Sequence, residues 1–491
     1  MNSALWIIGF FLAFALLVGI RAKGGKKMEL EQWAVGGRGF GAVLVFLLMA
    51  GENYTTFTFL GASGYTYGKG APAFYILAYG CLAFVMSYWM MAAVWRYAKQ
   101  NKLVSFSDFF ASKYDSRTLG VLVSIVSAFG LNALLVIQLR GLGVIVAEAS
   151  YGAISPSLAI WIGAVTIVSY VLISGIAGSA HISIFKDAII LVLAVFLGIY
   201  LPFHYYGGFT RMFQHIQTTS PGFLRLPAKG QSLSWYNSTI FLIAVGYYMY
   251  PHTLTAVYSA KSVQAVRRNA YLMPLYQVVL LFMFFVGFAA ITQVPGLHGK
   301  DTDLALLRLV KQTFAPWFVG IIGGAGLLTA LVPASMILLN ASVILAKNVY
   351  QQGFSPRATE QRVALVAKIA LPLFALLAVF QVLRGGGTLV ELSIFASGML
   401  SQMVPAFLFS LLPRPFGNKY GAFAGIAVGT AVLGYVSLTN VTLADLLPSW
   451  PVALVDINVG LVALLLNAFT FSAVSLCTRR LAQTSSKALI S

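Results

Sequence analysis

Residues 44–68 read LVFLLMAGENYTTFTFLGASGYTYG, an apolar run interrupted by a polar patch. Gly51 precedes the patch, and Gly61 and Gly64 follow it. The run is long enough to cross a membrane, and non-helical backbone at that depth occurs only where it faces protein or a water-filled cavity. The patch therefore predicts a broken helix beside a buried site. Its polar members are Glu52, Asn53, Thr55, Thr56 and Thr58.

A second interrupted run lies at residues 241–262, FLIAVGYYMYPHTLTAVYSAKS. Gly246 and Pro251 bracket a group of tyrosines, and His252 follows the proline. Two Gly- or Pro-interrupted spans at matching positions of two halves indicate the binding site of a transporter that is built from repeats. We therefore expect the two runs to face one another across a central site.

The composition around these runs is that of a polytopic membrane protein. Of the 491 residues, 59% are hydrophobic and 9% are charged, whereas soluble globular chains carry roughly 25% charged residues. A cytosolic enzyme and a secreted domain are both excluded by this balance. The two cysteines exclude a disulfide framework and a multi-cysteine metal site.

Thirteen apolar segments are long enough to span the hydrocarbon core, which takes about 20 helical residues. The predicted fold class is therefore an all-α integral membrane protein. The predicted spans are 3–21, 41–63, 72–97, 119–147, 157–175, 184–203, 236–256, 271–293, 317–347, 363–383, 388–412, 419–437 and 453–475.

The distribution of Lys and Arg predicts the orientation of these spans. Basic residues are concentrated in alternate connections, which the positive-inside rule places in the cytoplasm. The N-terminus is then outside and the C-terminus is cytoplasmic. Lys186 and Asp187 fall at the entrance of the span 184–203, where we expect both side chains to be solvated.

The two interrupted runs lie five spans apart, which predicts two five-helix repeats of opposite orientation. No polar stretch is long enough to form a separate soluble domain. We expect a single transporter domain over residues 1–491, with a peripheral helix at 3–21, repeats at 41–203 and 236–412, and two peripheral helices at 419–475.

Glu52 is an acidic residue inside a predicted span, which makes it a functional candidate by default. Three roles are open: a carrier of the coupled proton, a direct ligand of sodium, or a structural carboxylate bonded to backbone amides. For the solute, the candidate binding residues are Asn53, Thr55, Thr56, Tyr247, Tyr248 and Gln402, the last of which precedes Pro405 in ASGMLSQMVPAF.

The sequence contains no phosphate-binding glycine loop, catalytic triad or metal-ligand spacing. We therefore expect neither enzyme activity nor a cofactor.

The chain resembles the sodium:solute symporter family over nearly its whole length. The resemblance is carried by FLGASGYTYG (59–68), LVSFSDFFASKYDSRTLG (103–120), YVLISGIAGSAHISIFKDA (170–188), YPHTLTAVYSAKSVQAVRRN (250–269) and TALVPASMILLNASVILAKNVY (329–350). Within the family, residues 51–76 and 248–262 are most similar to bacterial monocarboxylate permeases. The resemblance implies the leucine-transporter fold, alternating access, a coupling cation and a place in a bacterial inner (plasma) membrane.

The resemblance also implies a sodium site between the first broken span and the ninth span. The backbone carbonyls of Gly51 and Tyr54 correspond to sodium ligands of the family. In the ninth span the family has a small residue followed three and four positions later by Ser or Thr.

This chain departs from the family pattern in the ninth span. The small residue is Ala330, but Pro333 and Ala334 offer no hydroxyl, and Ser335 is turned about 100° away on a helix. The coupling cation is therefore a proton or sodium, and both remain open.

The function expected from the sequence is cation-coupled import of a short monocarboxylate such as pyruvate, lactate or acetate. The alternatives are a sodium-coupled symporter of an amino acid, a sugar or a vitamin, and a transporter-like sensor or channel. The expected partners are the solute, the coupling ion and the lipid bilayer, without nucleic acid or an obligatory protein partner.

Overall fold

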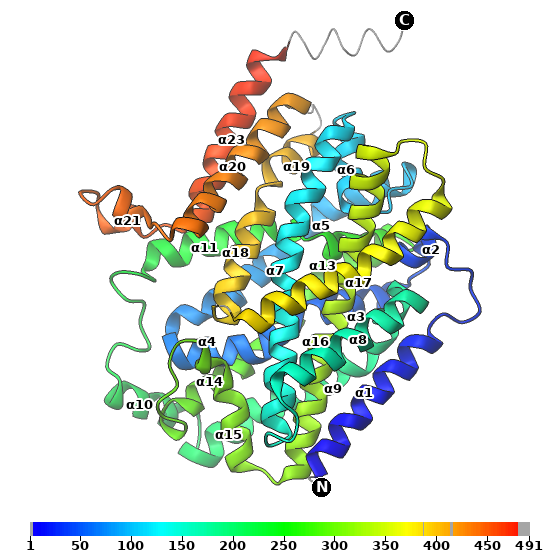
Figure 1. The fold of residues 1–491 in the computed structure, drawn as a ribbon. Coiled ribbons are helices and arrows are strands. Elements are labelled where there is room, and N and C mark those ends of the chain that lie inside the picture. The colour runs from blue at the N-terminus through cyan, green and yellow to red at the C-terminus, as the bar shows by residue number, and fades with distance from the viewer. Residues whose placement is uncertain (1–2, 386, 413–415, 480–491) are drawn as a thin grey trace, which may run out of the picture.

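The computed structural model describes residues 3–385, 387–412 and 416–479, and over these ranges the chain is helical without a β-strand. Arg414, Arg480 and Lys487, which contribute to the predicted cytoplasmic charge, lie outside the described residues. The helices form one bundle, with α20 and α23 side by side along one edge (Figure 1).

Ten described segments are long and apolar enough to cross a membrane by themselves. They contain α1 (Ser3–Arg21), α5 (Tyr75–Gln100), α7 (Arg117–Ala149), α8 (Pro156–Ser174), α9 (Ile176–Tyr206), α13 (Val263–Gln277) continued by α14 (Leu280–Gln293), α16 (Pro316–Ile344), α17 (Glu360–Arg384), α20 (Lys419–Thr439) and α23 (Val459–Cys477).

Three further spans are bent helix pairs, which brings the described total to the thirteen that the sequence predicts. The pairs bend by 52°, 49° and 45° in chain order. They are α3 (Ala42–Asn53) with η2 (Phe57–Gly61) and α4 (Ala62–Lys69); α11 (Leu233–Gly246) and η4 (Tyr247–Met249) with α12 (Pro251–Ser259); and α18 (Leu389–Ser401) with α19 (Val404–Leu411).

Short helices occur between the described spans or at their ends. They are α2 (Leu30–Val35), η1 (Gly36–Arg38), η3 (Ala71–Phe74), α6 (Phe106–Lys113), α10 (Phe209–Thr219), η5 (Gly299–Leu304), α15 (Ala305–Thr313), η6 (Leu345–Phe354), α21 (Leu443–Leu446) and α22 (Val452–Val455).

The boundary between α8 and α9 differs from the sequence prediction. The break is the single residue Gly175, with φ +54°, and α9 begins at Ile176 instead of 184. A side chain at Gly175 would also collide with the Trp33 carbonyl, because the added Cβ would lie 2.3 Å from its oxygen. Lys186 and Asp187 therefore lie well inside α9 rather than at its entrance.

The helix α16 lies at the centre of the bundle and contacts α1, α7 and α9. From Val319 onward nearly every residue of α16 is buried. Glycines let its neighbours approach closely: a Cβ at Gly320 would lie 2.6 Å from the Ala4 Cα of α1. Such small-residue contacts are the usual means of packing helices in membranes.

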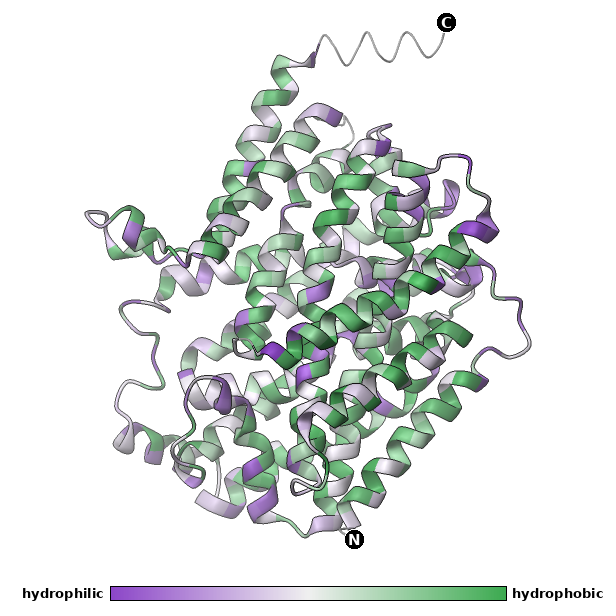
Figure 2. Ribbon diagram, in the orientation of Figure 1, coloured by the Kyte–Doolittle hydropathy of each residue, from purple (hydrophilic) through white to green (hydrophobic). Residues whose placement is uncertain are grey.

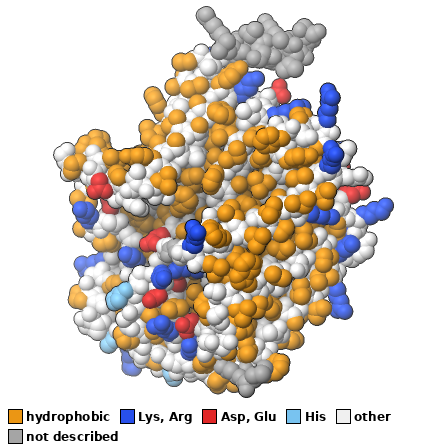
Figure 3. Space-filling model, viewed as in Figure 1, with side chains coloured by type: hydrophobic (Ala, Val, Ile, Leu, Met, Phe, Trp, Pro, Cys, Tyr) orange, Lys and Arg blue, Asp and Glu red, His pale blue; other side chains and the backbone are white. Residues whose placement is uncertain are grey.

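The outer surface is apolar, as a lipid-facing surface requires. Trp6, Phe10, Trp89 and Phe469 each expose 65% or more of their surface. Apolar residues run along most of the long helices in Figure 2, and Figure 3 shows hydrophobic side chains in a broad band, with Lys and Arg mostly on either side of it. The division of the spans into two repeats stays a prediction.

Candidate functional site between two broken helices

The first break arises because α3 loses its regular hydrogen bonds after Asn53. Tyr54 has φ −91° and ψ 85°, which lie outside the helical region. The backbone N–H of Thr55, which in a continuous helix would donate to the Gly51 carbonyl, donates instead to the Thr58 hydroxyl at 2.7 Å. The Gly51 carbonyl is thereby left without its helical partner.

The freed carbonyls accept hydrogen bonds from Lys186 of α9, whose side chain is fully buried. The ammonium Nζ donates to the Gly51 carbonyl at 2.8 Å and to the Tyr54 carbonyl at 2.7 Å. It also lies 2.9 Å from Oδ1 of Asp187, which is 3% exposed. The prediction that Lys186 and Asp187 are solvated was wrong, because α9 begins at Ile176, about two turns before the predicted start at residue 184.

The second break, between Gly246 and Pro251, is lined by aromatic rings. Tyr250 is extended, with φ −74° and ψ 117°, and Pro251 begins α12. The Tyr247 ring centroid lies 5.4 Å from that of Tyr248 and 6.0 Å from that of Tyr250.

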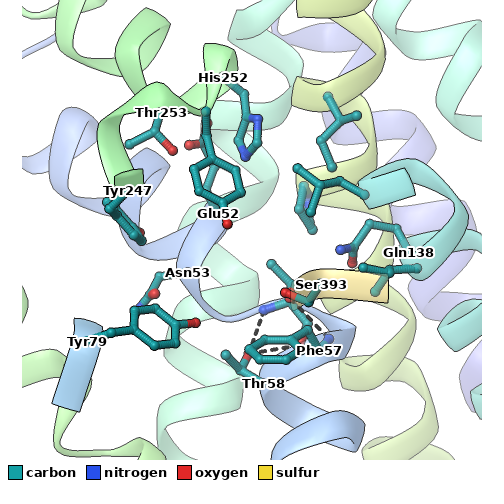
Figure 4. Close-up of a pocket in the computed structure, with 16 residues that line it drawn as sticks. Glu52, Asn53, Phe57, Thr58, Tyr79, Gln138, Tyr247, His252, Thr253 and Ser393 are labelled. Carbon is teal, nitrogen blue, oxygen red and sulfur yellow. Dashed lines mark hydrogen bonds between the residues drawn. The ribbon is translucent and has the colours of Figure 1, made fainter. Parts of the chain in front are cut away.

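A cavity of about 70 Å³ lies between the two breaks. Figure 4 shows side chains from both broken helices directed into it, together with side chains from α5, α7 and α18. The lining residues are Glu52, Asn53, Thr55, Phe57, Thr58, Tyr79, Leu134, Ile137, Gln138, Tyr247, Tyr250, His252, Thr253, Pro333, Ile337 and Ser393.

Glu52 is the acidic residue of this cavity, and its side chain is 8% exposed. Neither carboxylate oxygen meets the geometry of a hydrogen bond with a described residue, although the Thr253 side chain lies close enough to interact with the carboxylate. The side chains of Thr253 and His252 lie beside it in Figure 4, and the His252 Nδ1 is likewise without a described partner. An unpaired carboxylate is costly at this depth unless it is protonated or binds something.

Three of the six predicted solute-binding residues line the cavity: Asn53, Thr55 and Tyr247. Thr56 and Tyr248 do not. The Thr56 hydroxyl donates to Oε1 of Gln138 at 2.9 Å, which ties the break to α7. Tyr248 is 2% exposed.

Gln402 also lies outside the cavity, in the break between α18 and α19. Its Nε2 donates to the Gly398 carbonyl at 3.0 Å, and its backbone carbonyl accepts a hydrogen bond from Nδ2 of Asn467 at 2.6 Å. Asn467 belongs to α23, so Gln402 joins the third break to a neighbouring span and does not line the cavity.

The ninth-span residues that the resemblance brings to the ion site are all buried. Pro333 lines the cavity, whereas Ala330 and Ala334 are packed in the interior. The Ser335 hydroxyl donates to the Val332 carbonyl at 2.5 Å and lies 2.5 Å from the Ser179 hydroxyl of α9. Its oxygen is thus engaged between α16 and α9.

The polar cavity residues Tyr79, Gln138, Thr253 and Ser393 were not among the predicted site residues. Gln138 lines the cavity from α7, and the signal for it was an amide inside the apolar run 119–147. Lys186 would have stood out as a cation inside a span if the span had been started at residue 176.

Comparisons with known proteins place the chain among transporters. The model of the sodium:solute symporter family matches residues 33–429. An uncharacterized symporter of Bacillus subtilis, YhjB, is 59% identical over 480 residues, which is 98% of each chain. A monocarboxylate transport permease protein of Rhizobium johnstonii is 25% identical, covering 87% of this chain and 88% of its own.

Among solved structures, a Na⁺-coupled sialic acid symporter in a substrate-bound outward-open state superposes with a TM-score of 0.80. It is 15% identical and covers 98% of both chains. The nucleobase-cation-symport-1 transporter Mhp1, in a closed conformation, gives a TM-score of 0.58 at 15% identity, covering 92% of this chain and 96% of its own. These likenesses confirm the leucine-transporter-like fold. The chain therefore belongs to the sodium:solute symporter family and is a multi-pass, cation-coupled membrane symporter, not an enzyme.

Proposed function

We propose that this symporter imports a short monocarboxylate, such as pyruvate, lactate or acetate, together with a proton, by alternating access. The observation that carries the proposal is the unpaired Glu52 carboxylate in a small cavity between two broken helices. A cavity of about 70 Å³ suits a solute of only a few heavy atoms. The Rhizobium relative, whose printed name specifies monocarboxylates, supports the same solute class.

The charges around the cavity support a proton as the coupled ion. Among the described residues that line it, none is Lys or Arg, and Glu52 is the one acid. Two carboxylates a few ångströms apart repel strongly in a medium of low dielectric constant. A protonated Glu52, by contrast, donates a hydrogen bond to a bound carboxylate, so the anion and the proton bind together.

Gln138 is the proposed hydrogen-bond donor to the solute carboxylate, in place of Gln402. Its Oε1 accepts from the Thr56 hydroxyl, which leaves the amide NH₂ as the group available to the cavity. Tyr79 and Ser393 line the same space with their hydroxyl-bearing side chains, whereas the Tyr250 hydroxyl is hydrogen-bonded to the Ser397 hydroxyl at 2.5 Å. Together these groups offer hydrogen-bond donors to an anion, but none of them carries a positive charge. The proton that is bound by Glu52 therefore balances the negative charge of the solute.

Transport by proteoliposomes tests this function. An inward proton gradient in sodium-free potassium buffer should drive accumulation of labelled pyruvate, and unlabelled lactate or acetate should compete where proline, pantothenate and glucose do not. Liposomes without protein are the control for acids that cross the bilayer unaided. Accumulation that needs sodium and ignores the proton gradient would contradict proton coupling, and competition by proline instead of lactate would contradict the solute.

The voltage response is a second signature of the same reaction. One proton and one monocarboxylate anion carry no net charge together, whereas moving a single charge through 100 mV is worth about 2.3 kcal/mol. We therefore expect a potassium diffusion potential to change the initial rate very little. A steep dependence on voltage would indicate a second coupled cation.

A further inference from the structure

The cation-accepting position at the first break is already filled by the chain itself. In transporters of this architecture, unwound backbone carbonyls and the C-terminal ends of half-helices coordinate the coupling cation. Here the two carbonyls at the end of α3, those of Gly51 and Tyr54, both accept hydrogen bonds from the ammonium of Lys186. The position is therefore occupied by a covalently attached cation.

The ammonium also has a counter-ion of its own. Oδ1 of Asp187 lies 2.9 Å from Nζ, and both side chains are buried. A buried charge is tolerated when it is paired and hydrogen-bonded, and Lys186 has one ion pair and two hydrogen bonds. This arrangement stabilises the break without any diffusible ion.

The opposite wall does not supply the oxygens that a sodium ion would need. Pro333 and Ala334 of α16 carry no hydroxyl, and the Ser335 hydroxyl is engaged by Ser179 and the Val332 carbonyl. Gly51 itself is packed closely: an added Cβ would lie 2.6 Å from the Ser183 hydroxyl oxygen of α9, which donates to the Ser179 carbonyl, and 3.3 Å from a Val332 methyl group of α16. The α16 wall therefore offers an apolar contact, and the carbonyls of Gly51 and Tyr54 accept hydrogen bonds from an N–H donor.

We propose that the Lys186 ammonium takes the place of a coupling sodium ion at the first break, so that sodium neither binds there nor drives transport. Lys186 is thus the residue that selects against sodium. This role of Lys186 rests on the proposed function in one respect: the proposed function names the proton as the coupled ion once sodium is excluded.

The test measures sodium binding to purified full-length protein through the midpoint of thermal unfolding, in NaCl and in KCl of equal concentration. Removing the lysine in Lys186→Ala leaves two carbonyls and the Asp187 carboxylate facing an open space. We expect this variant to gain a sodium-specific rise of a few degrees that the wild type lacks, because a ligand that binds the folded state stabilises it. Adding a hydroxyl in Lys186→Ala/Ala334→Ser should enlarge the rise.

Two matched controls separate the site from a general effect of losing a buried charge. Lys186→Met removes the charge but keeps the length of the side chain, so it should gain no sodium response. Lys368→Ala removes another lysine inside a span, on α17, and should behave as the wild type. If Lys186→Ala unfolds during purification in potassium buffer, the yield of folded protein in sodium buffer and in potassium buffer is compared instead. A higher yield in sodium then reports the same stabilisation by bound sodium.

A sodium response of equal size in the wild type and in folded Lys186→Ala, whether present or absent in both, would overturn the proposal. No solute is added, so an error in the proposed monocarboxylate or in the role of Glu52 would leave this result unchanged. Conversely, a sodium-independent wild type that fails to transport monocarboxylates would overturn only the proposed function.

Discussion

The two broken helices that flank the cavity bend by nearly the same angle, 52° and 49°, but they stabilise their interrupted backbones in different ways. At the first break the freed carbonyls bind the ammonium of Lys186. At the second, Pro251 starts the next helix and the rings of Tyr247 and Tyr250 pack around the turn. Similar bends thus serve different chemistry, with ionisable groups concentrated at the first break and aromatic walls at the second.

The largest expected effect is on proton-driven accumulation, which a substitution at the first break should abolish and a substitution at the second break should only slow. Glu52→Gln keeps the size of the side chain but cannot carry the transported proton. Accumulation of labelled pyruvate driven by a proton gradient should fall to the level of empty liposomes, while exchange of internal for external solute continues. Tyr247→Phe removes one hydroxyl from the second break and should lower the rate only modestly. Equal pH-driven accumulation by Glu52→Gln and wild type would rule out Glu52 as the proton carrier.

The next effect concerns how closely each break is packed. A Cβ at Gly246 would lie 1.9 Å from the Ser401 hydroxyl oxygen, and one at Gly51 would lie 2.6 Å from that of Ser183. Overpacking of this kind costs about 1–3 kcal/mol, occasionally more. Gly246→Ala should therefore lower the unfolding midpoint in detergent more than Gly51→Ala does.

Second-site variants make that comparison sharper. Ser183→Ala should restore most of the stability of Gly51→Ala, because the remaining contacts, with the Ser183 Cβ and a Val332 methyl group, lie at 3.3 Å. Ser401→Ala should rescue Gly246→Ala only in part, because the Ser401 Cβ would remain 2.8 Å away. The reverse pattern of rescue would mean that the backbone at one break shifts to accommodate the methyl group.

The third break, between α18 and α19, provides a contrast because its amide residue Gln402 lies outside the cavity. Asn467→Ala removes the donor to the Gln402 carbonyl, and a buried acceptor left unpaired costs about 1–3 kcal/mol. We expect a lower unfolding midpoint for Asn467→Ala, and also for Gln402→Ala, which loses the side-chain hydrogen bond to the Gly398 carbonyl. The KM for the solute should be unchanged in both. Thr55→Ala, which alters the cavity, should instead raise the KM. A raised KM in Gln402→Ala would return that residue to the solute site.

The smallest effect contrasts the unpaired Glu52 with a fully paired acid outside the spans. Burial alone would raise the pKa of Asp108, but the charge and hydrogen bond of Lys347, with hydrogen bonds from Asn348 and Val104, hold that pKa below its usual range. A lowered pKa contributes stability above the unfolded value of about 3.9, and this is lost as pH falls through the folded value.

The measurement is the unfolding midpoint followed from neutral pH to below pH ~4. The wild type should lose stability in the acid range, and Asp108→Asn should show a flatter profile that starts from a lower midpoint. A wild-type profile that rises toward acid pH would contradict the sign of this contribution.

Much of the fold could be predicted because membrane thickness fixes the length of an apolar span, and Gly and Pro beside polar residues mark where a span breaks. The thirteen predicted spans are confirmed on this basis. The predicted start of α9 was wrong because the Gly- and Ser-containing stretch from Ser174 to Ser183 reads as a turn between two spans. In the structure, one glycine with positive φ is enough to reverse the chain between α8 and α9.

The cavity was harder to predict than the spans because a helix that is apolar on all sides gives no periodicity from which to read direction. Gln402 and Gln138 are both amides in apolar runs, yet only Gln138 lines the cavity. Glu52 could be identified because acidic residues are rare within membrane spans and usually have a functional role there. Which of the neighbouring hydroxyls share its cavity depends on where the backbone turns at Tyr54.

The tethered cation at the first break also limits how much solute the cell can concentrate. A cation that cannot dissociate does not move down a gradient, so Lys186 stabilises the first break but contributes no driving force to transport. If one proton is the sole ion that moves with each anion, the steady-state concentration ratio cannot exceed tenfold for each pH unit across the membrane, since one pH unit is worth about 1.36 kcal/mol. Such a carrier would run in reverse as readily as forward, exporting acid whenever the interior is the more acidic or the more concentrated side.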